Sequence, residues 1–354
     1  MTTAFSPVSG NAYAIGACQP ASADLCQNEL LSLTPPCKAV HWLDAGTPVI
    51  LLPEPFATSA PNISAAKPIF LRHMFPADLW LPPDTLANAD ILADALAPLI
   101  TKPVALQIRR VAVDRNSELS FAGTAALAEA LSKKGLLLPE QKQQAPLDSN
   151  VLSGVITPEG GIFGVSKVSD NISPHAGGMR HFTPEETAHL ISRAEHKLSE
   201  AIEAFSLELP KGGEALDLGA APGGWSKVLL SHGMRVTAVD PASLAPELSG
   251  KVAHFAGLAQ DFAKTELSKQ APARFSVIVN DMRLDVAESA QVMVSLAPLV
   301  MEGGLVIMTF KLPQKGKTAA IKKGMAIMEQ AYARQNARQL FHNRSEITAV
   351  FTKK

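Results

Sequence analysis

The segment Leu216–Trp225, LDLGAAPGGW, constrains the fold of this 354-residue chain more than any other stretch. The residues just before it, Glu214–Asp217, are typical of a short buried strand, and Ser226–Leu230 is typical of a helix start. A strand that turns on glycines into a helix presents backbone N–H groups at the helix N-terminus, and glycine lets a ligand approach the backbone closely. In an open parallel sheet such a turn lies at the carboxyl end of a strand, where ligands bind.

This glycine-rich loop is not a nucleotide-phosphate loop. No Lys-Ser/Thr pair follows at the P-loop spacing, and there is no G-x-G-x-x-G, which also disfavours an NAD-dependent Rossmann enzyme. On this segment alone, an ordinary strand–helix turn in an α/β core stays open as the alternative.

Strands and helices alternate after the loop, which predicts an α/β domain with a doubly wound, mostly parallel sheet. The expected strands are Arg235–Val239, Val252–Phe255, Phe275–Val279, Leu305–Phe310 and Ile347–Phe351. Acids follow several of them. Asp240 is placed to accept ribose hydroxyls, Asp261 to meet an adenine amino group, and Asp217 to orient backbone and a methionine ammonium under the loop. Each acid alone is equally compatible with a cap or turn residue.

Lys311 follows an apolar run, Val306–Phe310, at the end of a predicted core strand. A lysine acts as a general base only when burial or a neighbouring cation lowers its pKa. Lys311 therefore suits removal of a proton from a weakly nucleophilic hydroxyl.

The pattern Asp-x-Gly-x-x-Pro-Gly-Gly-Trp resembles the S-adenosylmethionine loop of class I methyltransferases, and its Pro-Gly-Gly-Trp part resembles the FtsJ-type ribose 2′-O-methyltransferases. That family uses a Lys-Asp-Lys-Glu tetrad. The matching positions are Lys197 in SRAEHKL, Asp281 after the fourth strand, Lys311 in FKLP and Glu346 in RSEIT. The resemblance implies that Lys311 is the base and that the other three residues orient it and tune its pKa. It also implies that S-adenosylmethionine is bound by Ser192, Asp217, Gly219, Ala221, Pro222, Gly223, Gly224, Trp225, Asp240, Asp261 and Asp281. No metal site is expected.

The run Gln339–Thr348, QLFHNRSEIT, is similar to the C-terminal pattern of the RlmM branch of this family. The likeness in length and domain order implies methylation of a cytidine 2′-hydroxyl in large-subunit (23S) ribosomal RNA. The loop departs from that branch at Ala221, where its members commonly have cysteine.

The N-terminal half predicts a helix at 84–100, a strand at 104–113, a helix at 124–134 and a hairpin of 150–157 with 161–168. By position this α+β unit resembles the THUMP RNA-binding domain. The candidate phosphate contacts are Arg109, Arg110, Arg115, Lys133 and Lys134, and for each of them a position without RNA contact stays open as the alternative.

Four segments are therefore expected. They are an N-terminal α+β region at 1–82, a THUMP-like domain at 83–170, a Gly/Ser/His-rich linker at 171–182 and a methyltransferase domain at 183–354. Thr183-Pro184-Glu185-Glu186 has the signature of a capping box and predicts a helix from there to about Phe205.

Composition sets the remaining expectations. The chain is 47% hydrophobic, has no apolar run of about eighteen residues and begins without a secretory signal, so we expect a cytoplasmic monomer with no membrane partner. Cys18, Cys26 and Cys37 lack C-x-x-C spacing and are expected to be buried or free thiols. Since the catalytic half has no cysteine, a cysteine-dependent base C5 methylation is excluded. From Lys311 to Lys354 ten Lys/Arg stand against two Glu, a net charge of +8, which suits an RNA backbone or a solvated helix face.

Three other functions remain. A base N-methyltransferase usually has Asn/Asp-Pro-Pro-Tyr/Phe after the fourth strand, whereas this chain has Asn280–Arg283, NDMR. A non-catalytic assembly factor that binds S-adenosylmethionine and RNA would keep the fold without the chemistry. A 2′-O-methyltransferase acting on a different RNA would keep both.

Overall fold

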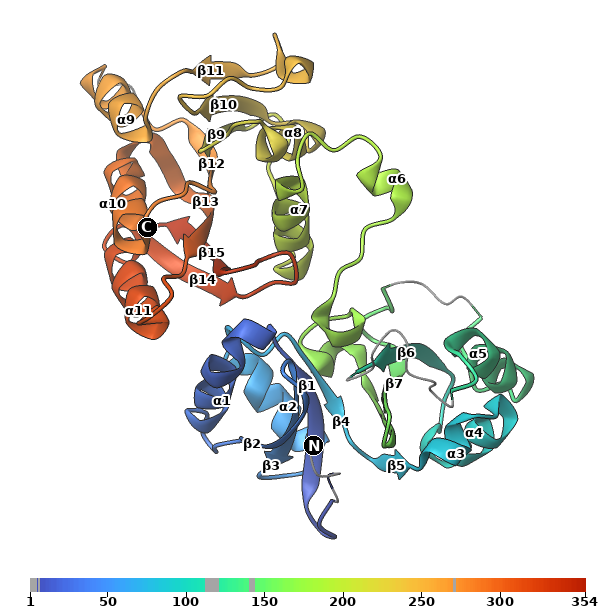
Figure 1. Cartoon of the computed structure of the whole chain (residues 1–354). Helices are drawn as coiled ribbons and strands as arrows, with labels where there is room; N and C mark the ends of the chain where they lie inside the picture. Colours follow the sequence, from blue (N-terminus) through green and yellow to red (C-terminus); the bar gives the residue numbers. More distant parts are fainter. Residues whose placement is uncertain (1–4, 6, 112–120, 140–143, 270–271) are drawn as a thin grey trace. The chain divides into compact units, whose positions relative to one another are not determined.

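The computed structural model describes residues 5, 7–111, 121–139, 144–269 and 272–354. The chain divides into two compact units, Met1–Met179 and Arg180–Lys354 (Figure 1). Among the described residues, no helix combines the length and apolar character needed to cross a membrane.

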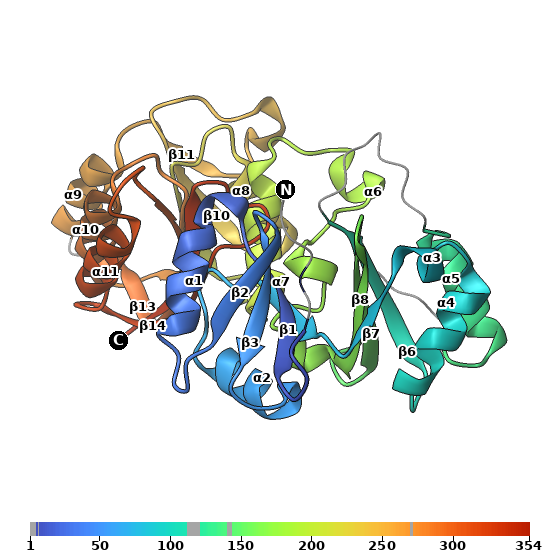
Figure 2. The same ribbon diagram turned by 60° about the horizontal axis from the view of Figure 1, so that its bottom comes forward.

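The first unit begins with a βαββαβ lobe of the ferredoxin-like type. Its elements are β1 (Ala12–Ala17), α1 (Ala23–Leu31), β2 (Lys38–Asp44), β3 (Thr47–Leu52), α2 (Phe56–Ala65) and β4 (His73–Pro76). The strands form an antiparallel sheet of order β2-β3-β1-β4 (Figure 2). Cys18, Cys26 and Cys37 are buried free thiols, as expected.

The second lobe has the predicted order of helix, strand, helix and two strands. It contains β5 (Leu79–Leu81), α3 (Pro83–Leu86), α4 (Ala89–Leu96), β6 (Val104–Arg110), α5 (Thr124–Lys133), β7 (Asn150–Thr157) and β8 (Gly160–Lys167). Its sheet order is β5-β8-β7-β6, with β6 parallel to β7 and the other pairs antiparallel. The helix expected at 84–100 is interrupted at Asn88, whose side chain caps α4 by accepting the Asp90 and Ile91 N–H groups. The end of the strand expected at 104–113, and Arg115, lie outside the described residues.

The segment expected as a linker, 171–182, is largely part of the first unit, which extends to Met179. Asn171, His175, Gly177 and Gly178 are buried, and the short 3₁₀ helix η4 (Ala176–Gly178) packs on β4 and β6. Burial of this segment explains why its glycine-rich composition does not make it a free tether.

The second unit contains a seven-stranded sheet of order β11-β10-β9-β12-β13-β15-β14, in which β15 runs antiparallel to the other six described strands. This is the Rossmann-like class I methyltransferase fold. The strands are β9 (Glu214–Leu218), β10 (Arg235–Val239), β11 (Ala253–Phe255), β12 (Phe275–Asn280), β13 (Val300–Lys311), β14 (Tyr332–Arg338) and β15 (Glu346–Lys353).

Helices cover both faces of this sheet. In Figure 1, α7 (Ala194–Ala204) and α8 (Gly224–Ser231) lie on one side, while α9 (Ala259–Ser268), α10 (Val286–Ser295) and α11 (Lys317–Met328) lie on the other. The core under α7 and α8 joins Leu198 and Leu229 to Val277 and Ile307 of the central strands. This packing holds the carboxyl ends of β9, β10, β12 and β13 along one edge, where ligands bind in such sheets.

The continuous helix expected from Thr183 to Phe205 is wrong. The capping box is present, since Thr183 and Glu186 bond reciprocally, but the first helix is only α6 (Pro184–Thr187), and α7 starts at Ala194. The carboxylate of Glu195 accepts the N–H groups of Ile191 (2.6 Å) and Ser192 (3.2 Å), which stabilises the break. The chain therefore turns at Ser192 before α7 begins.

Candidate active site

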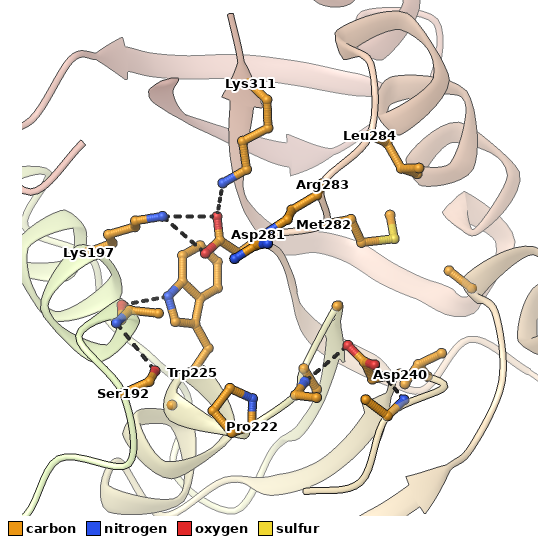
Figure 3. Close-up of a pocket in the computed structure, with 18 of the residues that line it drawn as sticks. Ser192, Lys197, Pro222, Trp225, Asp240, Asp281, Met282, Arg283, Leu284 and Lys311 are labelled. Carbon is orange, nitrogen blue, oxygen red and sulfur yellow. Dashed lines mark hydrogen bonds and ion pairs between the residues drawn. The ribbon is translucent and has the colours of Figure 1, made fainter. Parts of the chain in front are cut away.

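The glycine-rich loop joins β9 to α8 as a tight turn (Figure 3). Gly219 has a φ of +72°, and a Cβ placed there would lie 2.9 Å from Met282 Cα. Only glycine therefore lets the loop pass this close to the segment after β12. Gly219 N–H and Ala220 N–H both donate to Val239 O, at 3.0 and 3.3 Å, which ties the loop to β10.

A cavity of about 1400 Å³ opens beside this loop. Its walls come from the start of α7, the loop, and the residues that follow β10, β12 and β13. The expected site residues that line it are Ser192, Lys197, Gly219, Ala221, Pro222, Gly224, Trp225, Asp240, Asp281, Lys311 and Glu346.

Asp240 follows β10 and connects two backbone turns. Its Oδ2 accepts the N–H of Ala221 at 3.1 Å, and its Oδ1 accepts the N–H of Ala242 at 2.8 Å (Figure 3). A carboxylate fixed in this way, at the cavity wall and beside the loop, fits the hydroxyl groups of a nucleoside ligand.

Three expected cofactor residues do not line the cavity: Asp217, Gly223 and Asp261. Asp261 lies in the first turn of α9 with its side chain 57% exposed and 3.6 Å from Lys264. Gly223 is the residue before α8 and has a φ of +114°, so its role is to shape the turn. Asp217 is buried below the loop and accepts a 2.7 Å hydrogen bond from the Ser226 hydroxyl. Burial raises the pKa of Asp217 to about 7.

The start of α7 is held against the loop. The indole N–H of Trp225 donates to Ala194 O at 2.8 Å, and the Ser192 hydroxyl accepts the Ala194 N–H at 3.3 Å (Figure 3). A Cβ on Gly224 would collide with the Ser192 hydroxyl oxygen. Only glycine therefore lets the loop pack this closely against Ser192, which lies just before α7. This contact fixes α7 so that Lys197, one turn further on, points into the cavity.

Lys197, Asp281, Lys311 and Glu346 meet in one ion-pair network at the cavity wall. Lys197 Nζ lies 3.2 Å from Asp281 Oδ2 and 2.6 Å from Glu346 Oε1. Lys311 Nζ contacts Asp281 Oδ1 and lies 3.8 Å from Glu346 Oε2. Antiparallel pairing of β13 with β15 sets Lys311 opposite Glu346. Two lysines thus alternate with two carboxylates, and each lysine lies near both acids.

The surroundings shift the pKa values of Lys311 and Lys197 in opposite directions. Burial lowers the pKa of Lys311, and the nearby Lys197 ammonium adds to this effect against the opposing pull of Asp281 and Glu346. Burial also acts to lower the pKa of Lys197, but Asp281 and Glu346 outweigh it and the pKa is raised. For Asp281, burial acts to raise the pKa, yet Lys311 and Lys197 outweigh burial and lower it. Of the two lysines, Lys311 is therefore the one that releases its proton more readily.

Three supporting residues were not foreseen from the sequence. Thr309 donates to Asp281 Oδ1 at 2.7 Å, and Asn280 accepts the Met282 N–H at 2.9 Å, so both fix the segment after β12. Glu200, buried on α7, accepts the N–H groups of Phe341 and His342, each at 2.8 Å, and holds the turn before β15. A lone Thr in the apolar run of β13 was the available signal for Thr309. Nothing local marks Glu200.

Comparisons with known proteins find a matching family model and several similar proteins. Residues 190–344 match the family model of FtsJ-like methyltransferases. A protein of Shewanella amazonensis named Ribosomal RNA large subunit methyltransferase M is 28% identical over 305 residues, covering 79% of this chain and 79% of the relative. The protein of the same name from Tolumonas auensis is 30% identical over 239 residues, covering 63% of this chain and 61% of the relative.

Among solved structures, TrmN from Thermus thermophilus aligns at 15% identity with a TM-score of 0.38, over 97% of this chain and 100% of that one. At this level of similarity the alignment adds nothing to the assignment. The family match spans the loop, α7 and three members of the ion-pair network, and Glu346 follows two residues later. The C-terminal unit of this chain therefore contains an FtsJ-like methyltransferase domain.

Proposed function

We propose that this protein transfers a methyl group from S-adenosylmethionine to a ribose 2′-hydroxyl of large-subunit ribosomal RNA, with Lys311 as general base. One observation carries the proposal. A half-buried lysine with a lowered pKa lies at the wall of the cavity that the glycine-rich loop also lines, between two carboxylates that fix its position.

The cradle for the cofactor fits this assignment. Gly219 lies close to Met282 without a side chain of its own, and the backbone of the loop lines the cavity. Two backbone N–H groups hold Asp240 at the same cavity wall. In the proposal, the loop backbone and Asp240 bind S-adenosylmethionine, and Ser192 and Trp225 hold the wall in place. When bound, the cofactor supplies an electrophilic methyl group.

The protein residues act on the other reactant. The neutral Lys311 amine accepts the proton of the ribose 2′-hydroxyl, which turns a weak nucleophile into a strong one. Asp281 and Glu346 orient the Lys311 ammonium that forms and stabilise its charge. Lys197 holds both acids in place and, as a second cation, keeps the pKa of Lys311 down.

The RNA substrate is proposed from the relatives' name and from the resemblance to the RlmM branch, which also points to a cytidine. The exposed residues Lys315, Lys322 and Lys323 around α11 give the second unit a cationic surface suited to phosphates. The second lobe of the first unit, with its helix–strand–helix–strand–strand order, supports a THUMP-like RNA-binding role. We propose that the enzyme acts as a cytoplasmic monomer.

The test is methylation of unmodified large-subunit rRNA in vitro, with mapping of 2′-O-methyl groups. Lys311→Ala should lower single-turnover methyl transfer by about 10²–10⁴-fold while S-adenosylmethionine binds as before. Lys251→Ala is the control, because it removes an exposed lysine that neither lines the cavity nor belongs to the cationic surface around α11. Wild-type turnover in Lys311→Ala, or a methyl group on the base, would contradict the proposal. Binding of cofactor and RNA without turnover by the wild type would favour an assembly factor.

A further inference from the structure

Three arginines line the cavity that contains the ion-pair network, and the mechanism above does not use them. They are Arg193, Arg283 and Arg344. All three are exposed, so they lie where the cavity meets solvent. Within the part of the chain that the structure describes, no ion pair and no side-chain hydrogen bond engages their guanidinium groups. These three residues are called the arginine rim below.

Each residue of the arginine rim is close in sequence to one member of the ion-pair network. Arg193 has helical dihedral angles and precedes the first lysine of the network by four residues, a spacing that puts both on one helix face. Arg283 follows the aspartate of the network by two residues, on the segment between β12 and α10 (Figure 3). Arg344 precedes the glutamate by two residues, in the turn before β15. Three separate segments thus carry one arginine each to the cavity beside the network.

The turn that carries Arg344 is fixed by hydrogen bonds on both sides. The side-chain amide of Gln339 donates to Arg344 O at 3.4 Å. The N–H of Leu312, the residue after β13, donates to Ser345 O at 2.8 Å. The backbone at this position is therefore held to the end of β13, while the arginine side chain remains in solvent.

The backbone at the other two positions of the rim is fixed in the same way. Asn280 accepts the N–H of Met282, the residue before Arg283, at 2.9 Å. The Glu195 carboxylate accepts the two N–H groups immediately before Arg193. A ligand that binds the rim therefore orders three side chains but no loop, which keeps the entropic cost of binding small.

The rim makes the opening of the cavity suitable for an anion. The network itself is balanced, with two lysines against two carboxylates. The other acids among the described residues that line the cavity are Asp240 and Glu288. Asp240 accepts two backbone N–H groups beside the glycine-rich loop, and Glu288 is exposed on α10. Three guanidinium groups stand against these two acids, and the guanidinium fork matches the oxygens of a phosphate.

The structure of an RNA chain places phosphates next to the reacting hydroxyl. The 3′-phosphate is carried by the ribose carbon adjacent to the one that bears the 2′-hydroxyl, and the 5′-phosphate is attached to the same sugar. When the 2′-hydroxyl reaches Lys311 at the cavity wall, both phosphates must lie in the cavity or at its opening. A charged phosphate is most favourably placed at the opening, where water and the exposed guanidinium groups are available.

We propose that Arg193, Arg283 and Arg344 bind the phosphodiesters that flank the target ribose and so position the RNA strand over Lys311. This inference rests on the proposed function, because it takes the reacting group to be a ribose hydroxyl. It assigns to the rim a part of RNA binding that is separate from the exposed lysines around α11. Phosphate contacts of this kind fix the position of the strand without reading its sequence.

The test is binding of a single-stranded RNA oligonucleotide to the full-length protein, measured by fluorescence anisotropy over a series of KCl concentrations with S-adenosylhomocysteine present. Arg193→Gln, Arg283→Gln and Arg344→Gln should each reduce the slope of log K against log[KCl] by about 0.7, the value for one phosphate contact on a single strand. The triple variant should reduce it by about 2. Arg344→Lys keeps the charge without the fork, so it should retain the slope while the affinity falls.

Arg235→Gln is the matched control. Arg235 is the first residue of β10, so it lies at the opposite end of this strand from Asp240. Its side chain is 68% exposed, and it does not line the cavity. The salt dependence of RNA binding should be the same in this variant as in the wild type, and all variants should bind S-adenosylmethionine as the wild type does.

Unchanged slopes in the three single variants and in the triple variant would overturn the rim. A variant that loses affinity for S-adenosylmethionine but keeps the slope would also overturn it, because that arginine would then hold the cofactor carboxylate. Binding is measured without methyl transfer, so the two proposals fail separately. Ribose methylation by the wild type together with unchanged slopes would contradict the rim alone. Reduced slopes together with a methyl group on the base would support the rim and contradict the proposed function.

Discussion

The hydroxyl of Thr309 donates a 2.7 Å hydrogen bond to Asp281 Oδ1, the same oxygen that Lys311 contacts. Thr309 lies on β13 two residues before Lys311, so one strand supplies both the candidate base and a group that fixes its acidic partner. Thr309 is 1% exposed and touches neither cofactor nor substrate in the proposed mechanism, so we regard it as a positioning residue.

Thr309→Val should therefore lower kcat about three- to tenfold, the loss expected for one hydrogen bond of about 0.5–1.5 kcal/mol. Steady-state methylation and cofactor titration are the measurements. Thr309→Ser restores the hydroxyl and should recover most of the rate. An unchanged rate in Thr309→Val would show that Lys197 and Lys311 alone fix Asp281.

Lys197→Met should move the pH dependence of methyl transfer. Burial lowers the pKa of Lys311, and Lys197 lowers it further. Without Lys197 the pKa of Lys311 rises, so the increase of kcat with pH moves to higher pH. At a pH below that pKa, the fraction of Lys311 in the neutral form falls about tenfold for every unit by which the pKa rises. The pH profile of single-turnover transfer checks this, with Lys197→Arg, which keeps the cation, as the control. A movement to lower pH would contradict the assigned role.

Asp217 should make the protein less stable at higher pH. Its pKa is raised from 3.8 to about 7 by burial, so the folded state holds a proton that the unfolded state releases. The associated stability is complete below about pH 4 and is lost as pH rises through about 7, at a slope of up to about 1.4 kcal/mol per pH unit.

Asp217→Asn mimics the protonated acid and should flatten that dependence, making the variant more stable than the wild type above pH 7. Denaturant unfolding between pH 5 and pH 8 measures the difference. The same change at the exposed Asp261 should leave the pH dependence as it is. Parallel curves for the wild type and Asp217→Asn would show that Asp217 is ionised in the folded protein.

Gly219→Ala should impair cofactor binding as well as stability. Its φ of +72° costs alanine about 1–2 kcal/mol, and its Cβ would lie 2.9 Å from Met282 Cα. Gly250→Ala is a matched control, because Gly250 has a φ of +70° and nothing within 4 Å of the added Cβ. Both variants should lose stability, but only Gly219→Ala should lose affinity for S-adenosylmethionine. Equal affinity in the two would mean that the loop does not hold the cofactor.

Strand ends were the predictable part of the site. Asp240, Asp281 and Lys311 each follow an apolar strand, and parallel strands bring their carboxyl ends to one edge, so these residues met as expected. Asp261 follows a strand too, but its side chain is directed by the first turn of α9, which the pattern does not specify.

Features that depend on tertiary contacts were not predictable. The helix breaks before α7 because the Glu195 carboxylate accepts backbone N–H groups there, a contact that the sequence pattern does not reveal. The strand β14 lies at the edge of the sheet and carries polar residues, so it lacks the apolar pattern of a buried strand. The first lobe was expected as an α+β region at 1–82 but not element by element, because prolines obscure its pattern, with Pro48 inside β3 and Pro61 inside α2.

The position of β15 late in the chain determines the order in which the strands of the second unit can pair during synthesis. Within the part of the chain that the structure describes, β14 pairs only with β15, and β15 begins at Glu346. During synthesis from the N-terminus, a growing chain acquires the glycine-rich loop, Lys197, Asp281 and Lys311 while β13 still lacks its antiparallel neighbour. Until residues 346–353 have emerged, Lys197 is missing one of its two carboxylates and β14 has no strand to join. A nascent or prematurely terminated chain that lacks β15 therefore cannot complete the ion-pair network.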